Sequence, residues 1–215
     1  MSLGAEVPAA LSDFLAFVQL GFRHIVGPGA LDHELFLLAL AAIYRPRDWR
    51  DAVKVVSAFT VGHSLSLALV VTGTLRVSSA VVEFLIPVTI LATAVENVAV
   101  CGRERGASRR RADLRVLCTG IFGLVHGAGF AGYLRSLFVD RVALPLVGFN
   151  CGVEVGQICV LVVAACVLAT VDRAVSRARL PEGVSPLRAR ALAVSALVAL
   201  VALRWAVERS PWPLS

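Results

Sequence analysis

Long apolar runs without charged side chains constrain this chain more than any other feature of its sequence. Residues 55–75 are 21 consecutive positions with no aspartate, glutamate, lysine or arginine, and an α-helix needs about 20 apolar residues to cross a bilayer. Hydrophobic residues make up 58% of the chain and charged residues 17%, and the mean hydropathy is +0.80. Such values are typical of a polytopic membrane protein. We therefore predict an all-α, polytopic transmembrane helical bundle that forms a single integral-membrane domain over residues 1–215.

Five further segments are also predominantly apolar, although each contains a few charged residues, so the sequence predicts six membrane helices. They cover residues 30–44, 53–75, 79–101, 114–137, 142–172 and 187–208. A shorter helix is predicted over residues 8–26, because Asp13 and Arg23 interrupt it and Pro28 with Gly29 breaks any continuation. The run that follows this break is too short to cross alone, so residues before it must complete the crossing. The sequence leaves open whether residues 8–26 lie at the interface, re-enter the membrane or form a seventh span.

The net charge of +6 is distributed in a way that predicts orientation. Basic side chains gather between the apolar runs, at residues 45–54, 103–115 and 173–190. Short loops rich in lysine and arginine stay in the cytoplasm, so these three loops should lie inside and the C-terminus outside. The same distribution argues against a nucleic-acid partner, and the lipid bilayer is the partner that we expect.

Histidines stand deep within the predicted spans. Counted at about 1.5 Å per residue from the cytoplasmic ends, His33, His63 and His126 each lie about 14–17 Å deep. That depth is near the midplane of a hydrocarbon core of about 30 Å. The fourth histidine, His24, lies near the end of the N-terminal helix. A single intramembrane histidine can serve only as a hydrogen bond between helices, but four together favour a ligand site.

Carboxylates accompany these histidines. Asp32 directly precedes His33, and Glu96 and Glu154 lie inside predicted spans, where ionisable groups are costly and commonly mark an ion path. Imidazole combined with carboxylate suits nickel, cobalt, zinc or iron better than it suits magnesium or calcium. We therefore predict that a divalent transition metal ion binds to a set drawn from seven residues: His24, Asp32, His33, His63, Glu96, His126 and Glu154.

Glycines concentrate in residues 120–133, where Gly123 and Gly127 are four residues apart. Small residues at this spacing let membrane helices approach closely, so we predict that they bring His126 against a neighbouring helix. A phosphate-binding loop requires a preceding strand and a lysine, and neither is predicted here. We expect no nucleotide partner, so that any transport would be passive or coupled to an ion.

Six motifs follow one another along the chain: GFRHIVG, ALDHELFLLAL, SAFTVGHSLSLAL, VEFLIPVTILATAVEN, FGLVHGAGFAGYL and FNCGVEVGQ. As a set, they resemble the successive motifs of the HupE/UreJ family of membrane proteins, which is associated with nickel uptake for hydrogenase and urease. The resemblance implies a bacterial inner-membrane helical bundle that moves Ni²⁺. It also implies candidate ligands: His24, Asp32, His33, His126 and Glu154, with His63 and Glu96 from the intervening motifs.

Three functions are compatible with this sequence. A permease would place exchangeable ligands at several depths along a path. An intramembrane zinc hydrolase would hold one ion with His33, His63 and His126 and would use Glu154 as a general base. A structural module would use the polar groups only as hydrogen bonds between helices. The spread of depths favours the permease over an enzyme, with Ni²⁺ preferred to Co²⁺, Zn²⁺ or Fe²⁺ as cargo. Association into a homo-oligomer stays open.

Overall fold

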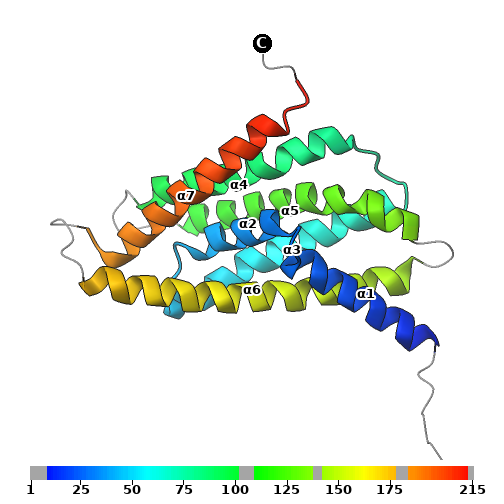
Figure 1. The fold of residues 1–215 in the computed structure, drawn as a ribbon, viewed down its shortest axis with the longest axis horizontal. Coiled ribbons are helices and arrows are strands. Elements are labelled where there is room, and N and C mark those ends of the chain that lie inside the picture. Colours follow the sequence, from blue (N-terminus) through cyan, green and yellow to red (C-terminus); the bar gives the residue numbers. More distant parts are fainter. Residues whose placement is uncertain (1–8, 102–108, 138–141, 178–183, 213–215) are drawn as a thin grey trace, which may run out of the picture.

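The computed structural model describes residues 9–101, 109–137, 142–177 and 184–212, and within these ranges it contains helices but no strand. The helices are α1 (Ala9–Val26), α2 (Leu31–Ala41), α3 (Trp49–Val71), α4 (Ser79–Cys101), α5 (Arg109–Leu137), α6 (Ala143–Arg177) and α7 (Pro186–Glu208), with a short 3₁₀ turn, η1 (Pro46–Asp48), before α3 (Figure 1). The predicted all-α helical bundle is confirmed.

Five of the described helices are long and apolar enough to cross a membrane, namely α3, α4, α5, α6 and α7. Helices α1 and α2 pass the same test only as a pair, and the pair is bent by 66° at the break between them. Pro28 and Gly29 lie in this break, where proline cannot continue the hydrogen-bond ladder of α1. The described chain is thus a multi-pass membrane protein with up to six spans, the first of which is broken or re-entrant.

Close contacts between helix backbones hold the bundle together in pairs, α3 against α5 and α1 against α6 (Figure 1). A methyl group added at Gly123 or Gly127 of α5 would overlap the carbonyl oxygens of Phe59 and His63 in α3. Gly152 of α6 is held equally close to α1. Such close approach requires residues without a side chain. The predicted packing role of Gly123 and Gly127 is confirmed, and it presses α5, which carries His126, against α3, which carries His63.

Two apolar clusters contain aromatic rings that pack around the histidines. The first contains Phe36 and Phe59, and its rings approach the ring of His126 with centroids 5.1 and 5.2 Å away. The second contains Phe149, and His24 lies 5.5 Å from that ring. Helices that are apolar on several faces bury the side chains that lie between them. The polar rings are therefore enclosed by apolar packing.

Arg190 joins three helices at the end of the bundle where α2 ends and α7 begins. Its guanidinium donates to the carbonyl oxygens of Ala42 and Tyr44, with nitrogen–oxygen distances between 2.7 and 3.2 Å. It also donates to Asp172 of α6 at 2.5 Å. The carbonyl groups that follow a helix have no partner within it, so a basic side chain at the C-terminus of α2 satisfies them.

Arg115 occupies a similar position at the same end of the bundle, near the start of α5. It is buried, pairs with Glu96 of α4 at 2.9 Å and donates to the Asn97 side chain at 3.1 Å. Its guanidinium also lies over the ring of Tyr44, 5.7 Å from the centroid. One end of the bundle therefore contains the ends of α2 and α4 and the starts of α5 and α7. These helix ends adjoin the three predicted basic loops.

Candidate metal centre

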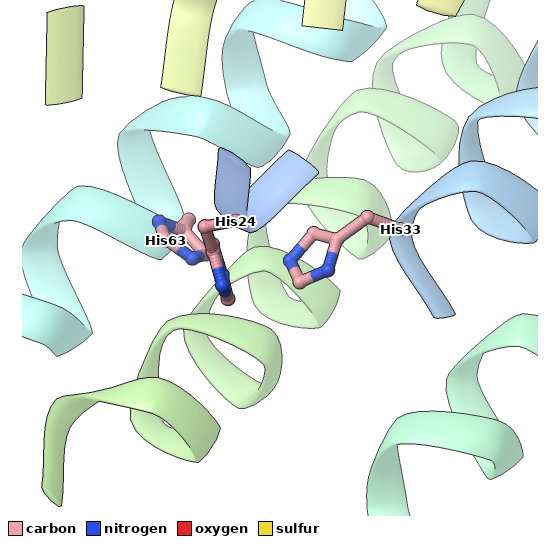
Figure 2. Close-up of side chains that lie close together, drawn as sticks. All are labelled: His24, His33 and His63. Carbon is pink, nitrogen blue, oxygen red and sulfur yellow. The ribbon is translucent and has the colours of Figure 1, made fainter. Parts of the chain in front are cut away.

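Three histidines from three consecutive helices converge inside the bundle (Figure 2). His24 lies near the C-terminus of α1, His33 in the first turn of α2 and His63 in the middle of α3. One ring nitrogen from each can be chosen such that all three lie within 4.8 Å of one another. The break after α1 makes this possible, because it turns the chain so that the last turn of α1 and the first turn of α2 face the same space.

Four of the six ring nitrogens of this group are buried without a hydrogen-bond partner. Nε2 of His24, Nε2 of His33 and both nitrogens of His63 are buried and make no hydrogen bond. The ring centroids are 4.7 Å apart for His24 and His33, and 5.9 Å apart for His63 and each of the other two. A buried polar atom without a partner costs about 1–3 kcal/mol. A cation bound by the nitrogen lone pairs would offset this cost.

His126 adds a fourth imidazole beside the group. Its ring centroid is 5.3 Å from that of His33. Its Nε2 lies 3.0 Å from the hydroxyl oxygen of Thr89, and that hydroxyl also lies 2.7 Å from the carbonyl oxygen of Ile86. A hydroxyl has one hydrogen. If Thr89 donates it to Ile86, then Nε2 of His126 is the protonated nitrogen and Nδ1, which has no partner, carries a free lone pair.

The three predicted carboxylates lie elsewhere. Asp32 is bound by Arg209, with nitrogen–oxygen distances of 3.1 and 3.3 Å. Glu96 is paired with Arg115. Glu154 is exposed on α6 and lines a groove against α3. Among the described residues, only His24, His33 and His63 form a group of three potential ligands with this mutual spacing.

The sequence did not reveal the residues that position these ligands. Arg209 binds Asp32 from 177 residues away, and Arg115 binds Glu96 from the next helix. Thr89 was one hydroxyl in an apolar run, although it fixes the ring of His126 in this structure. A polar residue in an otherwise apolar span is a usable signal for such a role, but the sequence does not identify its partner.

The described chain combines several membrane-crossing helices with a buried group of unpartnered imidazoles, which defines a multi-pass membrane protein with a candidate metal centre. Comparison with family profiles matches residues 4–209 to the family described as HupE / UreJ protein. The chain belongs to the HupE/UreJ family, as its motifs predicted. Comparisons with curated proteins and with solved structures gave no match.

Proposed function

We propose that this protein is a membrane permease for a divalent transition metal ion, with Ni²⁺ as the favoured cargo. The observation that carries the proposal is the set of buried, unpartnered ring nitrogens on His24, His33 and His63. A structural role would use these nitrogens in hydrogen bonds between helices. Neutral imidazoles suit nickel, cobalt, copper and zinc, and membership of the HupE/UreJ family supports transport of such an ion.

The ligand set favours exchange over permanent retention. In the proposed mechanism, the ion gives up water molecules for the nitrogens of His24, His33 and His63. Nδ1 of His126, beside His33, then offers the next lone pair, so that one imidazole can leave as another binds. The neighbouring imidazole of His126 thus gives the ion a further ligand of the same kind with which to exchange. Conduction requires this balance between binding and release.

The alternative of an intramembrane zinc hydrolase requires three fixed ligands, a metal-bound water and a general base close to that water. The predicted base, Glu154, is exposed in the groove between α3 and α6. His33, His63 and His126 are buried within the bundle. The base and the three ligands thus differ in exposure to the surroundings, which supports the permease as the better hypothesis.

Metal analysis and uptake measurements test the proposal together. The purified protein should bind Ni²⁺ reversibly, in competition with Co²⁺, Zn²⁺ and Fe²⁺, and proteoliposomes should accumulate ⁶³Ni²⁺. His33→Ala and His63→Ala should abolish uptake while expression and helicity stay normal. Phe130→Leu is a matched control, since Phe130 packs 4.0 Å from the ring of His24 but offers no ligand atom. One zinc ion that survives dialysis, without uptake of any metal, would support the hydrolase instead.

The proposed function also includes a membrane and an orientation for the protein. We infer an inner-membrane protein whose basic helix ends face the cytoplasm and whose C-terminus faces outward, because the basic clusters adjoin one end of the bundle. A cysteine introduced after Ser215, in a background without the native cysteines, should react with an impermeant thiol reagent in intact cells. A cysteine introduced at Arg47 should react only after the cells are opened. The reverse labelling pattern would invert the orientation.

A further inference from the structure

A second polar site lies on the outside of the bundle, in a groove of about 540 Å³ between α3 and α6. Its polar lining consists of Ser57, Thr60 and Ser64 on α3 and Glu154 and Gln157 on α6, and its remaining lining is valine, isoleucine and leucine. Glu154 is eleven residues from the start of α6, which corresponds to about 16 Å along the helix. The groove is therefore at membrane depth, and none of its lining residues is a histidine.

Glu154 lacks a cationic partner within the described part of the chain. Three other carboxylates on membrane helices, Asp32, Glu96 and Asp172, each pair with an arginine. Glu154 forms no ion pair among the described residues, and no arginine or lysine lines its groove. An ionised carboxylate in apolar surroundings is costly unless a counter-charge is present. The groove therefore contains no positive charge to balance an ionised Glu154.

The hydrogen bonds of Gln157 indicate where that charge would bind. The hydroxyl oxygen of Thr60 lies 3.1 Å from the carbonyl oxygen of Val56 and 2.7 Å from Oε1 of Gln157. One hydroxyl hydrogen cannot serve two acceptors. Gln157 is 2% exposed, and its Nε2 has no partner.

Turning the Gln157 amide over resolves both problems, because it exchanges the positions of nitrogen and oxygen. Thr60 then donates back to Val56, as threonines in helices often do. Nε2 of Gln157 donates to the Thr60 oxygen, and Oε1 becomes the atom without a partner. In this arrangement Gln157 offers an acceptor oxygen instead of an orphaned N–H group.

Glu154 and Gln157 are three residues apart on α6, so they lie on the same face of the helix. The groove then presents carboxylate, amide and hydroxyl oxygens, which are hard ligands. Its single negative charge is neutralised by a monovalent cation, whereas a divalent cation would leave a net positive charge next to apolar side chains. We propose that this groove is a second, separate ion site that binds an alkali-metal cation, Na⁺, through Glu154 and Gln157.

Thermal unfolding of the purified, metal-free protein tests this site without reference to the histidines. A ligand that binds only the folded state raises the unfolding midpoint in a saturable way. The midpoint should rise when NaCl replaces choline chloride at constant ionic strength and constant pH. The rise should be absent in Glu154→Gln and retained in Glu83→Gln, a matched control that removes an exposed carboxylate from α4. An equal response to both salts, or a sodium response that persists in Glu154→Gln, would overturn the proposal.

Two variants of Gln157 keep the proposal testable even if Glu154→Gln does not fold. Gln157→Asn withdraws the amide oxygen by one methylene group, so the sodium concentration at half-saturation should rise. Gln157→Leu removes the oxygen, so half-saturation should require more sodium. Identical sodium dependence in both variants and the wild type would exclude Gln157 from the site. If Glu154 carried a proton in place of a cation, no variant would respond to sodium, and the proposal would fail.

Discussion

The histidine centre and the Arg190 network are both buried polar regions in an apolar bundle, yet they differ in how their polar atoms are used. All three guanidinium nitrogens of Arg190 donate to protein acceptors. The imidazoles of His24, His33 and His63 leave four buried nitrogens without any partner. Satisfied polar groups fix one arrangement of helices, whereas unsatisfied ones keep a binding capacity that a ligand can use. The contrast separates residues that hold this fold from residues that are available for an ion.

The largest expected effect is on stability, from Arg190→Met. This change leaves Asp172 and the carbonyl groups after α2 without their donor, and breaking a buried pair in this way should cost about 3 kcal/mol of folding free energy. Denaturant or thermal unfolding in detergent measures the loss. Arg204→Met is the matched control, because Arg204 is 77% exposed and its ion pair is with Glu208 on its own helix. Equal stability of the two variants would contradict the structural role of Arg190.

His63→Leu should weaken metal binding without destabilising the protein, in contrast to Arg190→Met. It removes two unpartnered nitrogens, so the metal-free variant should be at least as stable as the wild type. It also removes one coordinate bond, so the affinity for Ni²⁺ should fall on the order of 100-fold, or about 2.7 kcal/mol. Isothermal titration and thermal unfolding of the same preparation provide both readouts. Loss of stability without loss of affinity would place His63 with the structural residues.

Acidification should weaken metal binding steeply. An imidazole binds a metal ion only in its neutral form, so protons compete with the ion for each histidine. With several histidines bound together, the affinity should fall by more than about tenfold per pH unit at the acidic end of the range. Titrations at intervals from pH 7.5 to 4.5 measure this slope, which should be shallower in His63→Leu. An identical slope in the wild type and in His63→Leu would remove His63 from the site.

The smallest effect is expected from Thr89→Val. This change removes the hydroxyl that lies 3.0 Å from Nε2 of His126 and orients its ring, and loss of such an orienting partner typically reduces metal affinity by about tenfold. Thr89→Ser keeps the hydroxyl and should behave like the wild type. If Thr89→Val binds Ni²⁺ as tightly as Thr89→Ser, His126 is not oriented through Thr89 for binding.

The sequence predicts those features that depend on local pattern. The helical bundle follows from the apolar runs, and the break between α1 and α2 follows from Pro28 and Gly29. The close approach of α5 to a neighbouring helix follows from Gly123 and Gly127, although only the structure identifies that neighbour as α3. These signals reside in neighbouring residues, so no knowledge of the tertiary structure is needed to interpret them.

The pairing of charges depends instead on how each helix is rotated about its axis. The depth of Glu154 could be counted along the chain, but the direction in which its side chain points could not be predicted. Helix α6 is largely exposed in the structure. The sequence predicts Asp32 as a metal ligand because it precedes His33, but in the structure Asp32 is paired with Arg209. The depth of a residue in the membrane follows from its position along one helix, whereas its interaction partner depends on how all the helices pack.

The break between α1 and α2 has a mechanical consequence for the centre. His24 lies before the break and His33 after it, while His63 belongs to the continuous helix α3. Any change in the 66° bend therefore changes the spacing of His24 and His33, and α3 does not have to move. The three candidate ligands are thus divided by a bend in the chain, and a rotation of α2 relative to α1 would change the distances between them.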